Sequence, residues 1–221
     1  DVKYKDISGP DGVPDGVIDD YDKTNIGSPM PKFTFGWTNT FRYKNFDLSV
    51  FINGSYGNKV YNYLSMKLTH MNSPWTNQLN AVNGRAQLVP INPNKVYEDG
   101  TMWYNDVSNV MVANPGASIP RATINDPNDN DRISDRYIED GSYIRLKNIS
   151  LGYTFPKKTI DKLGLSNLRI YANIQNLLTI TGYDGYDPEI GASTSSVNVY
   201  GLDNGRYPSP TVYSFGLNVS F

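Results

Sequence analysis

Apolar and polar side chains alternate along five long segments of this chain, which is the pattern of β-strands with two chemically different faces. These segments are residues 32–43, 46–56, 143–156, 168–180 and 213–221. In the third segment, Ile144 and Leu146 are in the opposite phase to the apolar residues from Ile149 onward. One extra residue in a strand produces such a phase change, so the sequence predicts a β-bulge near Lys147.

The connections between the strands fall into two classes of length. Residues 44–45 form a short connection, and 156–167 form a modest one in which a helical turn should end at Gly164. Residues 58–141 and 182–209 form long connections instead. The strands are about twice as long as the roughly five or six residues of an average strand, and this length suits a tilted strand that crosses a bilayer. Short turns at one end and long loops at the other are typical of outer-membrane β-barrels.

The predicted fold class is therefore all-β, with antiparallel transmembrane β-barrel strands and long extracellular loops. The same interpretation divides the chain into an extracellular loop, a barrel hairpin, a second long extracellular loop and three C-terminal barrel strands. These parts are residues 1–31, 32–57, 58–141 and 142–221, the last of which contains extracellular loop 182–209. Alternation by itself leaves a second fold open, since a soluble β-sandwich with one hydrated face has the same pattern.

Composition removes several classes of function. Lys and Arg number 20 and Asp and Glu number 22, so the formal net charge of −2 gives no bulk attraction to nucleic acid. The chain has no cysteine, which excludes disulfides, thiolate nucleophiles and cysteine-zinc sites. No apolar run approaches the roughly 20 residues of a membrane helix. The 17 tyrosines stand beside many Asp, Asn and Gly residues, a mixture that favours strands joined by loops.

Several stretches of the chain resemble the C-terminal portion of the SusC/RagA family of TonB-dependent outer-membrane transporters. They are DRYIEDGSYIRLKNISLGYTFP at 135–156, LRIYANIQNLLTITGYDGYDPE at 168–189 and the terminal strand. The stretch at 26–62, which contains KFTFGWTNTFRY, is similar to strands slightly earlier in the same family. The resemblance covers nearly the whole chain and is weakest at 63–130.

The resemblance implies that this chain is a C-terminal piece of a larger receptor, whose barrel closes about 22 strands around a plug. Members of the family import oligosaccharides, and in some cases peptides, with a SusD-like surface lipoprotein as a lid and with energy supplied through TonB. The implied location is the bacterial outer membrane, in contact with its lipid, and no enzymatic activity is implied. Two other functions stay open at this point: a soluble carbohydrate-binding β-sandwich and a passive porin.

The N-terminal stretch DISGPDGVPDGVIDDYD, at 6–22, has the spacing of a calcium-binding loop. Counted from Asp11, oxygen donors fall at positions one, five, seven, nine and twelve of an EF-hand-like pattern, with Gly16 at the turn. The predicted Ca²⁺ ligands are Asp11, Asp15, the carbonyl group of Val17, Asp19 and Asp22. Val13 at position three and Asp in place of Glu at position twelve depart from the pattern, and an acidic surface turn is the alternative.

No catalytic residues are predicted. The single histidine, His70, has no second imidazole to help it bind a metal, and no motif around it indicates a catalytic triad. The stretch DPNDNDRISDR at 126–136 is rich in oxygen donors, which either an ion site or a loop of Asx turns explains. Glu98, Glu139 and Glu189 all fall in predicted loops, so no carboxylate pair for glycoside hydrolysis can be named.

Aromatic side chains are the remaining candidates for a binding role. They lie among Asp and Asn residues in the predicted loops, a mixture that can stack on sugar rings and hydrogen-bond to hydroxyl groups. The residues predicted to contact substrate or lid are Trp75, Trp103, Tyr104, Tyr183 and Tyr186. The alternative is that these rings pack the long loops together, because large loops need cores of their own.

Overall fold

A computed structural model describes residues 1–190 and 199–221 of the chain and divides them between two compact units. The sheet unit comprises residues 27–62 and 138–221, and the loop unit comprises residues 1–26 and 63–137. Predicted loop 182–209 includes residues 191–198, which lie outside the described residues. Within the described part, none of the helices has both the length and the apolar character needed to cross a membrane.

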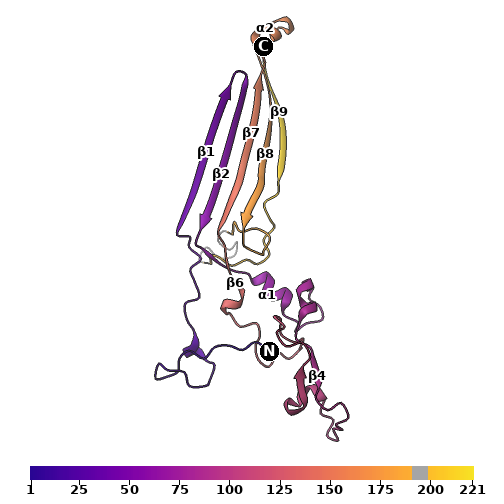
Figure 1. Ribbon diagram of the computed structural model, residues 1–221. Coiled ribbons are helices and arrows are strands. Elements are labelled where there is room, and N and C mark those ends of the chain that lie inside the picture. The colour runs from indigo at the N-terminus through magenta and orange to yellow at the C-terminus, as the bar shows by residue number, and fades with distance from the viewer. Residues whose placement is uncertain (191–198) are drawn as a thin grey trace. The chain divides into compact units, whose positions relative to one another are not determined.

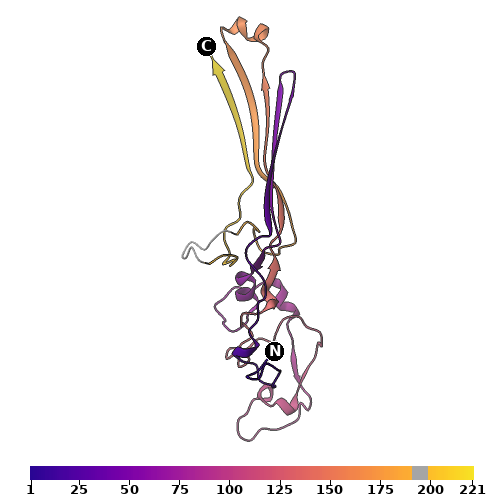
Figure 2. The ribbon, with the colours of Figure 1, turned by 90° about the vertical axis from the view of Figure 1, so that its left-hand side faces the viewer.

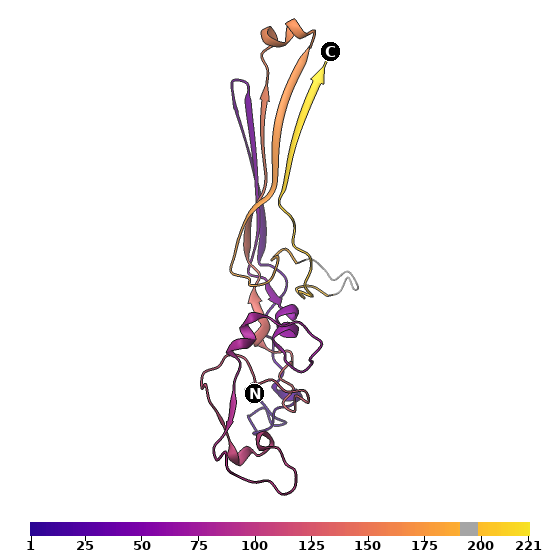
Figure 3. The same ribbon diagram turned by 90° about the vertical axis from the view of Figure 1, so that its right-hand side faces the viewer.

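The sheet unit is built on one five-stranded sheet in which every neighbouring pair is antiparallel (Figure 1). Its strands, in the order in which they lie side by side, are β1 (Phe33–Tyr43), β2 (Phe46–Tyr56), β7 (Tyr143–Thr154), β8 (Asn167–Thr181) and β9 (Val212–Ser220). Figures 2 and 3 show the β1–β2 hairpin at one edge of the sheet and β9 at the other. The prediction of an antiparallel, mostly-strand fold is confirmed.

One face of this sheet exposes a continuous set of apolar side chains. On β1 the rings of Phe33, Trp37 and Phe41 are each more than half exposed, and on β9 Phe215 is 83% exposed. These residues occupy alternate positions, so the period-two pattern of the sequence places them on the same side.

The opposite face of the sheet is polar, and small residues leave room for long charged side chains there. The guanidinium group of Arg169 on β8 binds the carboxylate of Asp47 on β2 at 2.6 Å, reaching across β7. A Cβ atom at Gly152, which lies between them, would stand 2.2 Å from the Arg169 guanidinium, so a larger residue there would displace this ion pair. Gly216 makes the same kind of space for the ring of Tyr171.

The two short connections lie at one end of the sheet, as Figure 1 shows. The β1–β2 turn places Lys44 in the left-handed region with φ 53°. The β7–β8 connection forms α2 (Lys157–Ile160) and the 3-10 helix η6 (Asp161–Leu163), which ends on Gly164 with φ 69°. The prediction of a helical turn ended by Gly164 is confirmed, because a left-handed cap favours the residue without a side chain.

The predicted bulge is present in β7. The register of β2 and β7 pairs Phe51 with Asn148. The next residue of β2, Ile52, pairs with Leu146, which makes Lys147 the extra residue. The bulge explains the phase change in the sequence, since one unpaired residue moves every later side chain to the other face.

Two small strands continue the sheet unit beyond the other end of the sheet. They are β3 (Lys59–Tyr61) and β6 (Ile138–Asp140), which pair with each other. The segment after residue 200 pairs with β3, because the N–H of Tyr61 donates to Gly201 O at 2.7 Å and the N–H of Asp203 donates to Tyr61 O at 3.0 Å. The two ends of connection 58–141 and the β8–β9 connection are therefore held together.

The loop unit contains short elements with few apolar residues between them. Its elements are η1 (Asp20–Asp22), α1 (Tyr63–Thr69), η2 (Asn80–Gly84), β4 (Leu88–Pro90), η3 (Trp103–Asn105), η4 (Val107–Asn109), β5 (Val110–Val112) and η5 (Asp135–Tyr137). Its buried apolar side chains are those of Met66, Val82, Ile119 and Tyr137. Beside this small core, Asp and Asn side chains of the unit accept hydrogen bonds from backbone N–H groups, as Asn130 does from Val2 and Asp22 does from Ile7.

Candidate functional sites

In the N-terminal acidic loop, Asp22 acts as an acceptor for backbone N–H groups. Its Oδ1 accepts from Ile7 at 2.7 Å and from Ser8 at 3.2 Å, and its Oδ2 accepts from Asp19 at 2.9 Å. These hydrogen bonds stabilise the carboxylate form, and the bond from the N–H of Asp19 has the largest effect. They hold the pKa of Asp22 below its ordinary value. The carboxylate therefore joins the start of the chain to η1.

The other predicted calcium ligands lie along the same loop without gathering around one point. Asp15 Oδ1 accepts from the N–H of Val17 at 3.0 Å, and Asp11 is exposed. Asp6, which the spacing does not select, accepts from the N–H of Gly16 at 2.6 Å, while its Oδ1 is buried and has no hydrogen-bond partner among the described residues. Within that part of the chain, no three of the predicted carboxylates lie within 4.8 Å of one another. The calcium site stays a prediction.

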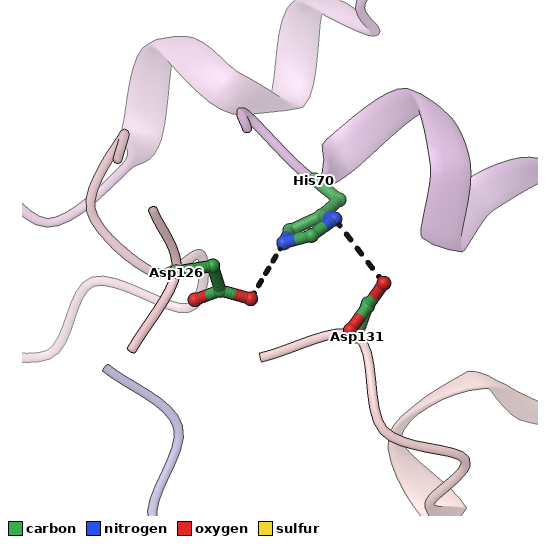
Figure 4. Close-up of side chains that lie close together, drawn as sticks. All are labelled: His70, Asp126 and Asp131. Atoms are coloured by element: carbon green, nitrogen blue, oxygen red, sulfur yellow. Dashed lines mark hydrogen bonds and ion pairs between the residues drawn. The ribbon is translucent and has the colours of Figure 1, made fainter. Parts of the chain in front are cut away.

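A group of ligand-type side chains that the sequence did not connect lies in the loop unit (Figure 4). His70 directly follows α1, and its N–H continues the helix by donating to Met66 O at 3.0 Å. Its Nε2 lies 2.8 Å from Asp126 Oδ2, and its Nδ1 lies 3.6 Å from Asp131 Oδ2. The side chains of His70 and Asp126 are each 9% exposed, and that of Asp131 is 38% exposed.

Asp126 is held in place by the loop that carries it. Both the N–H and the side-chain amide of Asn130 donate to its carboxylate, the N–H at 2.7 Å. Asn130 Oδ1 in turn accepts from the N–H of Val2 at 2.7 Å, which ties the start of the chain to this loop. Asp126 and Asp129 adopt positive φ angles of 32° and 48°. The 126–136 stretch is thus an Asx-type loop that also presents carboxylates to His70.

The predicted aromatic contact residues differ widely in exposure. Trp75 is 93% exposed and Tyr186 is 64% exposed. Trp103 and Tyr104 pack edge to face, with ring centroids 5.7 Å apart, and Tyr104 keeps 45% of its surface exposed. Tyr183, in contrast, is 5% exposed. Trp75 and Tyr186 therefore present rings that a ligand or partner can reach.

Tyr183 packs inside the β8–β9 connection. Its hydroxyl donates a short hydrogen bond to the carboxylate of Asp203, which is 2% exposed and also accepts from the N–H of Gly205 at 2.8 Å. Burial raises the pKa of Tyr183, and the hydrogen bond to Asp203 raises it further. The ring supports the fold of the connection from within.

An ion-pair network centred on Arg145 was not foreseen from the sequence. The guanidinium group is 3% exposed and binds the carboxylates of Asp187 and Glu189, the latter at 2.6 Å. Lys147, the bulged residue of β7, also binds Glu189 at 2.7 Å. Arg145 Nε donates to Thr179 Oγ1 at 2.8 Å, so the group spans β7, β8 and the loop that follows.

Asp187 joins the two ends of the β8–β9 connection. Its Oδ1 accepts from the N–H of Glu189 and its Oδ2 accepts from the N–H of Ser209, each at 2.9 Å. Burial acts to raise the pKa of Asp187, but hydrogen bonds from Arg145, Ser209 and Glu189 outweigh it and hold that pKa below its ordinary value. Alternation places Arg145 on the polar face, whereas the acids that bind it come from a segment without periodicity.

A cavity of about 690 Å³ lies beside this network in the sheet unit. Its lining includes Tyr143, Lys147, Glu189, Tyr200, Arg206 and Tyr207. This size falls in the range of roughly 300–1,000 Å³ that is usual for small-ligand sites. Aromatic rings and charged groups therefore lie side by side in the lining of the cavity.

Solved structures share the antiparallel, mostly-strand fold of this chain. Two structures of the RagAB peptide importer, in its closed-closed and open-open states, match 96% of this chain and 20% of theirs. Their TM-scores are 0.61 and 0.60, and their sequence identities are 19% and 20%. No family model matches the chain.

Relatives in sequence identify the family. TonB-dependent receptor P3 of Formosa agariphila is 35% identical over 223 residues, which is 99% of this chain. TonB-dependent receptor SusC of Bacteroides thetaiotaomicron is 29% identical over 209 residues, or 93% of this chain. The chain belongs to the TonB-dependent receptor family that includes SusC, whose members are receptors and not enzymes. It spans about a fifth of the length of these relatives, 19% and 17% respectively.

Proposed function

We propose that this chain forms part of the transmembrane barrel of a TonB-dependent outer-membrane importer of oligomeric nutrients, oligosaccharides or peptides. The observation that carries the proposal is the exposed apolar face of the five-stranded sheet in a chain with receptor relatives along nearly all its length. A soluble β-sandwich would cover that face with a second sheet. The apolar face instead suits contact with outer-membrane lipid.

The proposed topology follows from the two kinds of connection. The β1–β2 turn and the α2 connection lie on the periplasmic side, and connections 58–141 and 182–209 lie outside the cell. Short periplasmic turns and long extracellular loops are the usual arrangement in such barrels. TonB would act on a part of the full receptor outside these 221 residues.

The proposed partner of the long loops is a SusD-like surface lipoprotein that closes over the barrel. Supporting this are side chains of the loop unit that expose large apolar surfaces, among them Trp75 at 93%, Val107 at 92% and Ile124 at 78%. Large apolar side chains exposed to this degree favour a protein contact, since they would otherwise remain in water. The cavity beside Arg145 is proposed to contact the transported oligomer.

Fractionation and uptake test this function in one strain. The tagged full-length receptor should sediment with outer membranes, co-purify with a lipoprotein in mild detergent, and support uptake only while TonB is present. A passive porin would continue to transport without TonB. A receptor that stays in buffer after cell lysis would contradict the barrel assignment and favour the soluble β-sandwich.

We also propose that the acidic loop at 6–22 binds Ca²⁺ through the ligands that its spacing selects. Support comes from that spacing, since carboxylate oxygens are preferred Ca²⁺ ligands. The full-length receptor with Asp15→Asn should bind one Ca²⁺ fewer in calorimetry. Asp20→Asn is the matched control, because Asp20 lies in the same loop and pairs with Lys23 at the surface. Equal Ca²⁺ stoichiometry in both variants and the wild type would refute the site.

A further inference from the structure

The His70 cluster contains two carboxylates and little positive charge to balance them. Asp126 is nearly buried and Asp131 is partly buried, and both face the same imidazole. Among the described residues, no Lys or Arg forms an ion pair with either carboxylate. Since like charges held close together destabilise each other, a cation bound between these carboxylates would stabilise the cluster.

The two contacts of the imidazole differ in a way that indicates where a cation would bind. The 2.8 Å separation of Nε2 and Asp126 Oδ2 is that of a hydrogen bond. The 3.6 Å separation of Nδ1 and Asp131 Oδ2 is too long for one. Two ligand atoms on a tetrahedral Zn²⁺ ion, each about 2.1 Å from the metal, stand about 3.4 Å apart. The second contact therefore has nearly the spacing of two zinc ligands.

We propose that His70 and Asp131 bind a divalent transition-metal ion of the Zn²⁺ type, with Asp126 as the positioning residue. His70 Nδ1 and Asp131 Oδ2 are the protein ligands, and water completes the coordination. Asp126 accepts a hydrogen bond from the Nε2–H group. The proton therefore stays on Nε2, and the lone pair of Nδ1 is free to bind the metal. Metal-binding histidines commonly have this arrangement, in which a carboxylate orients the ring through its other nitrogen.

Burial and access support this division of roles. Asp126 is held by Asn130 and is 9% exposed, as a group that orients a ring should be. Asp131 is 38% exposed, so a metal ion can reach it from solvent. One nitrogen and carboxylate oxygens form a donor set that zinc accepts, whereas Ca²⁺ and Mg²⁺ favour oxygen donors alone.

Direct metal binding to the purified full-length receptor tests the site. After removal of metals with a chelator, calorimetry with Zn²⁺ should show one more bound ion in the wild type than in His70→Ala or Asp131→Asn. Asp126→Asn should keep the stoichiometry but weaken Zn²⁺ binding by roughly 10- to 100-fold, as expected for an orienting group. Asp129→Asn is the matched control, because Asp129 lies in the same loop and pairs with Arg132 instead.

The outcomes separate the metal site from a purely structural role. X-ray absorption spectra at the zinc edge should show one nitrogen neighbour and several oxygen neighbours in the wild type. These neighbours should change in Asp131→Asn, a variant that keeps the side-chain volume at a partly exposed position. A protonated imidazole that simply bridges the two carboxylates is the rival. In that case the wild type and Asp131→Asn would bind the same number of Zn²⁺ ions, and the proposal would be wrong.

Discussion

Replacing Arg145 with Met should loosen the β8–β9 connection while leaving the strands paired. Arg145 is 3% exposed and joins β7 to Asp187 and Glu189 in that connection. Methionine fills similar space but cannot neutralise the two carboxylates. Arg169→Met is a matched control on the neighbouring strand, because Arg169 also binds a carboxylate, that of Asp47, at a site where the side chains are 26% and 30% exposed.

The free-energy cost of Arg145→Met depends on the partners that Asp187 and Glu189 keep after the substitution. Removing one partner of a buried ion pair costs about 3–5 kcal/mol. Asp187 retains the N–H groups of Ser209 and Glu189, and Glu189 retains Lys147, so we expect the lower end, about 3 kcal/mol. That corresponds to an opening equilibrium roughly 150-fold more favourable. The more exposed pair should contribute less than about 1 kcal/mol, or at most about fivefold.

Hydrogen exchange of the connection measures this opening directly in the full-length receptor. The N–H of Ser209 donates to Asp187, so its exchange rate reports on whether the connection is closed. We expect exchange near Ser209 to accelerate by about two orders of magnitude in Arg145→Met and by a factor of a few in Arg169→Met. Equal rates in the two variants would show that burial of the Arg145 network contributes nothing, and the reasoning would fail.

Three further predictions test topology, membrane contact and pH. Cysteine at Ser73 should react with an impermeant reagent on intact cells, and cysteine at Asn45 should not; the reverse labelling would invert the barrel. Leu217→Arg, on the exposed apolar face, should cost about 2–4 kcal/mol and lower the amount of heat-modifiable folded receptor, whereas Asn218→Arg on the polar face should not; equal amounts would contradict the lipid contact. Because the pKa of Asp187 is lowered in the folded state, its contribution to stability is complete above the unfolded pKa near 3.9 and is lost as pH falls through the folded value. Proteolysis of the connection should therefore be constant from neutral pH to about 5 and accelerate only below about 4; acceleration already at pH 6 would assign the loss to another group.

The sequence by itself determined the strands and their local irregularities. Strand periodicity is a property of neighbouring residues, so alternation located all five strands without knowledge of their partners. The bulge at Lys147 and the helix end at Gly164 could also be predicted, because a phase change and a left-handed cap are local features. The family resemblance was carried by these same strand segments.

Tertiary structure decided which loop residues meet. His70 is 56 positions from Asp126, and Arg145 is 42 positions from Asp187, in segments that follow no repeating pattern. Tyr183 has the same sequence signature as the exposed Tyr186, yet its ring is buried against Asp203. A periodic pattern reports which side of a strand a residue occupies, whereas contacts between loops depend on how each loop folds back. Only the folded chain could therefore bring one histidine and two distant aspartates into a single cluster.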